Sequence, residues 1–301
     1  MRSFLSLFLF ILLSLSLGCK AFAQQPTPVL ASAQSISLAD LKAYPNKKEG
    51  LHIITWNIQN LGRSKSDAEI AQMAAVLRHA DVVAVQEVVG KDPAGAQAVA
   101  RLADELNRTG TKWDYQVSLP TKSPSPYISE RYAFLWKTQR VRLKRKAYLD
   151  KALQDEVYRE PFIGQFEDKI SAKAFYVINF HARKYNDQPE REIKTMGDYS
   201  ERLNTQALIL AGDFNLTERH TVWNPFYKKG FNAALNKNPT TLKRKCQEGV
   251  YRNHAIDNMF YPSGIQKIKA ASIDWVGDCN RLEQARTVSD HLPVWMHFKL
   301  N

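Results

Sequence analysis

Near its C-terminal end the chain reads Ser289-Asp290-His291-Leu292-Pro293-Val294, and this stretch is the starting point for interpreting the fold. Two ionisable side chains, Asp290 and His291, stand directly before an apolar segment over residues 293–300 that has the composition of a strand. Polar residues at the end of a buried strand normally face a surface cleft. Taken alone, the motif is also compatible with an ordinary capped strand entry.

Four other fragments place Asn, Asp or Glu at the end of an apolar, β-rich run. They are Trp56-Asn57-Ile58-Gln59, Gln86-Glu87, Gly212-Asp213-Phe214-Asn215 and Ile256-Asp257-Asn258. Carboxylate and amide oxygens suit a hard cation such as Mg²⁺, and histidines carry protons near neutral pH. Each fragment alone is also typical of a turn or a structural ion pair. Together they predict a metal-dependent phosphodiesterase site.

Two carboxylate-histidine pairs are candidates for the acid and the base of such a site. His181 follows a predicted strand over residues 174–180. Glu130 stands directly before another predicted strand, over residues 131–146. If these strands are neighbours, Glu130 can orient His181 and stabilise its charge, and Asp257 can do the same for His291. The sequence alone establishes neither pairing.

The chain has 301 residues and 44% apolar composition, which is enough for one domain with a large core. A short basic start followed by an apolar segment predicts a secretion signal over residues 1–23, cleaved after Ala23. Gly18-Cys19 leaves a lipoprotein tether at Cys19 open as an alternative. No other stretch is apolar enough to be a transmembrane segment. We therefore expect a secreted or periplasmic protein with a loosely held lead-in over residues 24–50 and a catalytic domain over 51–301.

The remaining cysteines, Cys246 and Cys279, form an even pair, and in an oxidising compartment they predict a disulfide. Two unpaired buried thiols are the alternative. The formal net charge of +12 favours a polyanionic partner. Basic residues concentrate at 137–146 and at Lys243-Arg244-Lys245, where they predict either a phosphate-binding surface or merely a solvated face.

Strand-like and helix-like segments alternate at both ends of the chain, and strands dominate its middle. Two mostly antiparallel sheets packed face to face, with helices outside, fit this order best. The predicted strands cover 51–58, 81–88, 114–119, 131–146, 162–166, 174–180, 207–211, 255–261 and 293–300, and the predicted helices cover 66–80, 94–108 and 189–203.

With these residues assembled, the chain resembles the endonuclease/exonuclease/phosphatase superfamily, and within it the deoxyribonuclease I-like nucleases, from about residue 51 to 300. The resemblance rests on eight motifs in a fixed order. These are Trp-Asn-Ile-Gln at 56–59, Gln-Glu at 86–87, Glu-Arg-Tyr-Ala-Phe at 130–134, Arg-Glu-Pro-Phe at 159–162, Asn-Phe-His at 179–181, Gly-Asp-Phe-Asn at 212–215, Ile-Asp-Asn at 256–258 and Ser-Asp-His-Leu-Pro-Val at 289–294.

The resemblance implies a four-layered α/β sandwich with its cleft at one end of the two sheets. It also implies roles for individual residues. Glu87 and Asn57 hold a divalent ion, while Glu130 pairs with His181 and Asp257 pairs with His291. The metal and phosphate shell is completed by Asp213, Asn215 and Asp290, and the substrate is bound by Arg159, Arg131 and Tyr132. The implied cofactor is Mg²⁺, with Ca²⁺ or Mn²⁺ as alternatives. The implied reaction is sequence-nonspecific cleavage of DNA to 5′-phosphate and 3′-hydroxyl ends by a monomer, with RNA as a second possible substrate.

Two positions depart from the deoxyribonuclease I pattern. That enzyme has an Arg and a Tyr at the DNA minor groove where this chain has Val89 and Ile128, so the duplex preference is open. A phosphatase or a sphingomyelinase-like phosphodiesterase on the same fold is the alternative function. An inactive nucleic-acid-binding or adhesion module is a third hypothesis, and the presence of every core motif argues against it.

Overall fold

The structure is a computed structural model that describes residues 35–44 and 49–301. Its helices are α1 (Leu38–Ala43), α2 (Asp67–Leu77), α3 (Ala94–Asn107), η1 (Lys151–Leu153), η2 (Tyr185–Asp187), α4 (Pro189–Lys194), α5 (Tyr199–Arg202), η3 (Thr221–Trp223), α6 (Asn224–Lys228), η4 (Cys279–Arg281) and α7 (Leu282–Val288). Its strands are β1 (Ser35–Ser37), β2 (Leu51–Leu61), β3 (Val82–Val89), β4 (Trp113–Val117), β5 (Glu130–Lys137), β6 (Val141–Leu143), β7 (Tyr148–Leu149), β8 (Phe162–Asp168), β9 (Ala174–His181), β10 (Leu208–Asp213), β11 (Asn232–Ala233), β12 (Leu242–Gln247), β13 (Val250–Arg252), β14 (Asp257–Tyr261), β15 (Ile265–Asp274) and β16 (Val294–Leu300).

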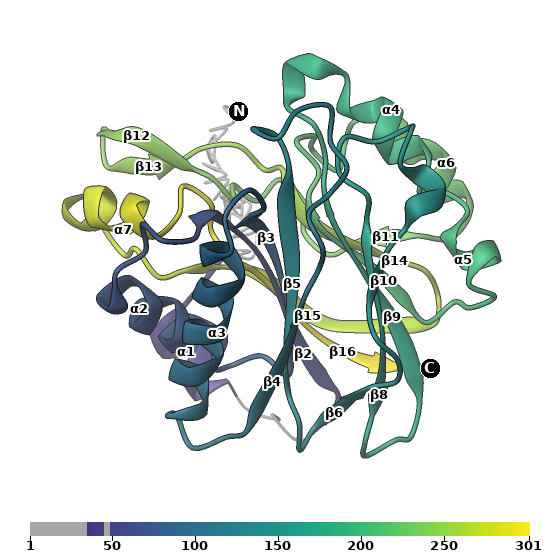
Figure 1. Ribbon diagram of the computed structural model, residues 1–301, viewed down its shortest axis with the longest axis horizontal. Helices are drawn as coiled ribbons and strands as arrows, with labels where there is room; N and C mark the ends of the chain where they lie inside the picture. The colour runs from purple at the N-terminus through teal and green to yellow at the C-terminus, as the bar shows by residue number, and fades with distance from the viewer. Residues whose placement is uncertain (1–34, 45–48) are drawn as a thin grey trace, which may run out of the picture. The chain divides into compact units, whose positions relative to one another are not determined.

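Two seven-stranded sheets form the body of the domain (Figure 1). The first has the order β1-β15-β16-β2-β3-β5-β4, and the second has the order β11-β14-β10-β9-β8-β6, with β7 paired to β8. Most neighbouring strands are antiparallel. The parallel pairs are β1 with β15, β2 with β3, and β9 with β10. This confirms the prediction of two mostly antiparallel sheets.

Alternation of side chains along the strands produces the layers. In β2, Ile53 points into the core between the two sheets, whereas the next residue, Ile54, points into a second core under α2 and α3. The second sheet has the same two-sided burial: Ile209 faces the first sheet, and Leu210 packs in a third core that includes Phe226 of α6. The four-layered α/β sandwich expected from the sequence is therefore confirmed, with helices on both outer faces (Figure 1).

Residues 131–146 do not form the single strand that their alternation predicts. The apolar run ends at Trp136, and a turn follows in which the Arg140 amide donates to the Lys137 carbonyl. The chain then crosses from the first sheet, as β5, to the second sheet, as β6. The predicted helix over 189–203 likewise divides into α4 and α5.

The N-terminal part of the described chain also differs from the expected lead-in. Residues 35–37 form β1, which pairs with β15, a strand that the sequence analysis missed. Ile36 and Leu41 are buried in the core under the helices, and Leu38 and Tyr44 pack against it, so apolar contacts hold this segment in place. The expected secretion signal and Cys19 lie outside the described residues. Across 35–44 and 49–301, no helix is long and apolar enough to cross a bilayer.

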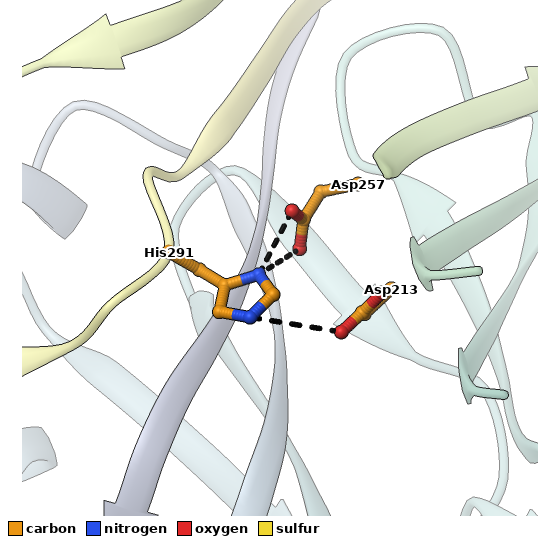
Figure 2. Close-up of side chains that lie close together, drawn as sticks. All are labelled: Asp213, Asp257 and His291. Atoms are coloured by element: carbon orange, nitrogen blue, oxygen red, sulfur yellow. Dashed lines mark hydrogen bonds and ion pairs between the residues drawn. The ribbon is translucent and has the colours of Figure 1, made fainter. Parts of the chain in front are cut away.

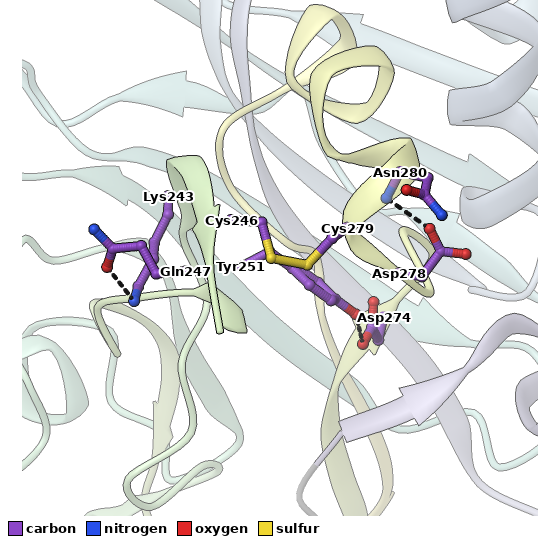
Figure 3. The surroundings of a disulfide bond; sticks show 8 residues. All are labelled: Lys243, Cys246, Gln247, Tyr251, Asp274, Asp278, Cys279 and Asn280. Atoms are coloured by element: carbon purple, nitrogen blue, oxygen red, sulfur yellow. Dashed lines mark hydrogen bonds between the residues drawn. A yellow bond between two sulfur atoms is a disulfide. The ribbon is translucent and has the colours of Figure 1, made fainter. Parts of the chain in front are cut away.

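Cys246 of β12 and Cys279 of η4 form a disulfide, with their Cα atoms 5.7 Å apart, which confirms the predicted pairing (Figure 3). The bond closes a loop with a sequence separation of 33 residues. It attaches the hairpin of β12 and β13, which pairs with neither large sheet, to the start of α7.

Replacing Cys246 and Cys279 together by Ser is expected to lower the free energy of unfolding by about 3–4 kcal/mol, because the open chain gains conformational freedom when it unfolds. Urea denaturation of oxidised wild type and of the double variant measures the difference. Equal midpoints for the two proteins would contradict the expectation, and reductant should shift only the wild type.

Candidate active site

The candidate site lies where the ends of several core strands meet. In the second sheet, Asp213 at the end of β10 is in register with His181 of β9 on one side and with Asp257 of β14 on the other. In the first sheet, Asn57 of β2 is in register with Gln86 of β3, beside Glu87. The polar strand ends that the sequence singled out therefore come together in space.

Gly212 permits the close approach of β10 and β9 immediately before Asp213. Its φ is +149°, and a Cβ atom there would lie 1.8 Å from the Phe180 carbonyl oxygen. No larger residue fits without displacing the backbone, because an overlap of that size exceeds any normal contact. The glycine of the Gly-Asp-Phe-Asn motif thus fixes Asp213 against His181.

Buried Asp257 and half-buried His291 form an ion pair (Figure 2). The two Asp257 carboxylate oxygens accept from His291 Nδ1 at 3.0 and 2.9 Å, and His291 Nε2 lies 3.8 Å from Asp213 Oδ2. Burial opposes a charge on the imidazole, but Asp257 and then Asp213 outweigh it and raise the pKa of His291 to about 10. His291 therefore carries a proton at neutral pH in this arrangement.

Glu130 and His181 form the second pair. His181 Nδ1 lies 3.0 Å from both carboxylate oxygens of Glu130, and its Nε2 lies 3.6 Å from Asp213 Oδ2. Burial again opposes the charged imidazole, yet the negative charge of Glu130 outweighs it and raises the pKa of His181. Arg159 is buried beside them, with Nε 3.3 Å from Glu130 Oε2.

Asp213 lies between the two imidazoles. Its Oδ2 accepts from Asn57 Nδ2 at 3.1 Å, and its Oδ1 accepts from the Asn215 amide at 2.9 Å. Burial is the main reason that the pKa of Asp213 is raised, and neighbouring Asp257 adds to it, while the two histidines act in the opposite direction. A carboxylate with a raised pKa can accept a proton more readily than an ordinary surface aspartate.

Asn57 and Glu87 offer oxygen ligands beside Asp213. Asn57 Nδ2 donates to Glu87 Oε1 at 3.1 Å, whereas Asn57 Oδ1 is buried and has no hydrogen-bond partner among the described residues. Burial opposes ionisation of Glu87, but the charges of His181 and His291 and the hydrogen bonds from Asn57 and Asn60 lower its pKa. An unpartnered amide oxygen next to an ionised carboxylate fits a hard divalent cation.

A different trio also has the spacing of metal ligands: atoms of Asp213, Asp257 and His291 lie within 4.8 Å of one another (Figure 2). Each of these side chains already has a close partner, since both Asp257 oxygens contact His291 Nδ1 and Asp213 accepts from Asn57. Hydrogen bonds within the trio therefore explain its close spacing without a metal ion. The free oxygen of Asn57 has no such explanation within the described residues.

Two residues predicted to bind substrate do not face the site. Tyr132 is fully buried between the sheets, and its hydroxyl accepts from the His181 amide at 3.1 Å, so it positions His181 and cannot contact substrate directly. Arg131, the adjacent residue of β5, points to the opposite face and donates to the Ser118 carbonyl. The Asp290 carboxylate, next to His291, lies 3.8 Å from Arg286 of α7. Its place in the metal and phosphate shell stays a prediction.

Arg159 makes its described contacts with the protein itself. Beyond Glu130, its guanidinium donates to the carbonyls of Ile128, His181 and Ala182 at 3.3–3.4 Å. It lines a cavity of about 390 Å³ together with Glu87, Glu130, His181, Lys91 and Tyr127. Arg159 therefore holds the end of β9, where His181 stands, and its predicted contact with substrate stays a prediction.

Sequence reasoning missed two hydroxyl groups that position the site. Ser289 Oγ donates to the Asn57 carbonyl at 2.6 Å and accepts from the His291 amide at 3.0 Å, which ties the segment that carries His291 to the end of β2. Thr240 Oγ1 donates to Asp257 Oδ2 at 2.7 Å. Ser289 stands in the Ser-Asp-His motif and could have been found there, whereas nothing in the sequence around Thr240 marks it.

A two-sheet α/β sandwich with two acid-histidine pairs and an Asn-Glu pair at one end defines a class of hydrolases that act on phosphate esters. The model of the Endonuclease/Exonuclease/phosphatase family matches residues 54–291, and the chain belongs to this family.

A curated relative, named "Deoxyribonuclease", comes from Thioalkalivibrio sp. (strain K90mix). It is 30% identical over 276 residues, which cover 83% of this chain and 72% of the relative. Among solved structures, an endonuclease/exonuclease/phosphatase from Bacteroides vulgatus has a TM-score of 0.62 at 14% identity, covering 84% of this chain and 100% of its own. D. rerio TDP2 complexed with single strand DNA product has a TM-score of 0.57 at 19% identity, covering 83% and 99%. At these identities the solved structures support the fold alone.

Gly212→Ala is expected to destabilise the protein by several kcal/mol, because the new Cβ overlaps the Phe180 carbonyl and the backbone must move. Gly110→Ala is the matched control: Gly110 also has a positive φ, +88°, but a Cβ there meets nothing within 4 Å. The control should cost only about 1 kcal/mol. Thermal unfolding of both variants gives the comparison, and equal losses would contradict this account of Gly212.

Proposed function

We propose that the protein is a secreted or periplasmic, divalent-metal-dependent endonuclease that cleaves DNA with little sequence preference, leaving 5′-phosphate and 3′-hydroxyl ends. The observation that carries this proposal is the position of Asp213 between the imidazoles of His181 and His291, beside the free oxygen of Asn57. The deoxyribonuclease relative and the basic composition support a nucleic acid as the substrate. The disulfide supports an oxidising compartment.

The protein's own groups suit hydrolysis by in-line attack of water on the phosphorus. Asp213, with its raised pKa, accepts a proton from the attacking water. His291, protonated at neutral pH, donates its proton to the leaving 3′-oxygen as the phosphorus–oxygen bond breaks. His181, held by Glu130, stabilises the negative charge on the phosphate. A divalent ion held by Asn57 and Glu87 would polarise the phosphate.

The rim of the cavity supports a nucleotide substrate. Tyr127 is 85% exposed, and Lys91 Nζ lies 4.3 Å from the centre of its ring. An exposed aromatic ring beside a cation can stack with a base while the cation faces a phosphate. These residues stand near Val89 and Ile128, where the sequence lacks the minor-groove pair of deoxyribonuclease I.

His181→Ala and His291→Ala are each expected to reduce plasmid cleavage by roughly 10²- to 10⁴-fold, because each removes an imidazole that acts at the reacting phosphate. Plasmid nicking in Mg²⁺ measures cleavage, and fluorescence anisotropy with labelled DNA in chelator shows whether binding persists. His254→Ala, at an exposed histidine, is the control. Near wild-type cleavage by either site variant would reject its catalytic role.

Glu87→Gln is expected to weaken Mg²⁺ binding by at least about tenfold while preserving the fold, since the amide keeps the size of the side chain but loses its charge. Isothermal titration with Mg²⁺ measures the affinity directly. Asp257→Asn is the comparison variant. If Asp257→Asn abolishes binding and Glu87→Gln does not, the ion belongs to the Asp213, Asp257 and His291 trio.

Parallel assays on plasmid, single-stranded DNA, RNA and sphingomyelin, with Mg²⁺ and with chelator, test the substrate class. Chelator-sensitive nicking of plasmid is the expected result. Release of phosphocholine without any cleavage of nucleic acid would overturn the proposal in favour of a sphingomyelinase-like activity.

A further inference from the structure

The tetrapeptide Leu-Lys-Arg-Lys occurs twice in the chain, at 143–146 and at 242–245, in two different electrostatic environments. In the first copy, Lys144 Nζ lies 2.5 Å from Glu167 Oε2, and Arg145 Nε donates to Gln165 Oε1 at 3.2 Å. Arg142 just before it also pairs with Glu167, at 2.6 Å. The positive charge of this copy is therefore partly neutralised by its own sheet.

The second copy has no acidic partner within the described chain. Lys243 Nζ donates to the neutral side chain of Gln247 at 3.0 Å, and Arg244 and Lys245 are exposed without an ion pair. These three cations, with Gln247 and Asn253, line an open hollow of about 550 Å³. An uncompensated basic hollow attracts an anion more strongly than an ion-paired strand does.

This second copy lies on β12 in the β12–β13 hairpin, directly beside the His291 pair. The Leu242 amide donates to the Asp290 carbonyl at 2.7 Å, and Thr241 forms a β-bridge with His291. Thr240, the next residue back, donates to Asp257. Three successive residues thus connect the basic tripeptide to the acid-histidine pair.

The hairpin depends on outside anchors for its position. Its two strands are in register only at Leu242 with Arg252 and at Gln247 with Val250, with an irregularity between, and an isolated two-stranded hairpin is at best marginally stable. The disulfide fixes it to η4 (Figure 3). Arg286 of α7 donates to the carbonyls of Leu242 and Lys243 at 2.9 and 3.4 Å. The helix α7 leads directly to His291, so hairpin and active site share one support.

We propose that the β12–β13 hairpin is a DNA-binding arm: Lys243, Arg244 and Lys245 bind phosphates of the substrate strand adjacent to the cleaved bond, and the disulfide holds them in place. This inference rests on the proposed nuclease function and specifies how that site acquires a preference for long polyanions. Each phosphate neutralised releases counterions, so the contribution of the arm is measurable as salt dependence.

The test compares two triple variants that remove the same three charges from the same tripeptide. Lys243→Gln/Arg244→Gln/Lys245→Gln alters the arm, and Lys144→Gln/Arg145→Gln/Lys146→Gln alters the first copy, in which Glu167 pairs with Lys144. Anisotropy with a labelled 20-base-pair DNA in chelator gives the affinity across a range of NaCl concentrations. The arm variant should flatten the slope of log affinity against log salt by about 2 to 3, at roughly 0.9 per lost phosphate contact. The control variant should leave the slope within about 0.5 of wild type.

Equal flattening by the two variants would overturn the proposal, because it would reduce the arm to a share of the general positive charge. An unchanged slope in the arm variant would overturn it as well. Binding in chelator is independent of turnover. The wild type could show a steep fall of DNA affinity with salt and yet never cut DNA in Mg²⁺. That result would refute the nuclease function but not the DNA-binding role of the arm.

The disulfide gives an independent test. With Cys246 and Cys279 both changed to Ser, and at a temperature where the variant remains folded, DNA affinity should fall about three- to tenfold as the arm loses its anchor. Adding the arm substitutions to this variant should then cost less affinity than it costs in wild type. Wild-type affinity in the double Ser variant would overturn the role of the disulfide in holding the arm.

Discussion

The structure depends on mutual neutralisation of buried charges at the meeting of the two sheets. Asp213, Asp257 and Glu130 are almost completely removed from solvent, which is costly for any carboxylate without a partner. Two imidazoles supply the partners, and each one contacts its own acid at about 3 Å and faces Asp213 with its other nitrogen. The backbone features around them, including the close approach at Gly212, keep these five groups within range of one another.

Much of the site could be predicted because its residues stand at the ends of apolar strands, and a sandwich brings such ends to one edge. Asn57, Glu87, His181, Asp213 and Asp257 were all found in this way. The error in β5 has an equally simple cause. Successive residues of a strand point in opposite directions, so Arg131 and Tyr132 could not both face the cleft. Applied strictly, that rule would have removed one of these two assignments.

The rest depended on long-range contacts that no local pattern carries. Polar composition concealed the pairing of β1 with β15, and the alternation over 131–146 continued through a turn that moves the chain from one sheet to the other. The two Leu-Lys-Arg-Lys tetrapeptides show what a local sequence pattern cannot predict. They are identical as sequence, and only the structure shows that Glu167 lies across from Lys144 in one copy while the other copy has no acidic partner among the described residues.

The pairing of β1 with β15 also bears on how molecules of this protein meet one another. Without β1, β15 would be the last strand of its sheet, and its unpaired amides and carbonyls would be open to a strand from another molecule. The short β1 covers Ser272, Ile273 and Asp274, and the half of β15 along which no other described strand pairs at this edge carries Lys267 and Lys269. Pairing with β1 protects one end of β15, and the positive charges of Lys267 and Lys269 repel the same edge of a second molecule at the other end. Together they discourage edge-to-edge aggregation, which increases with protein concentration.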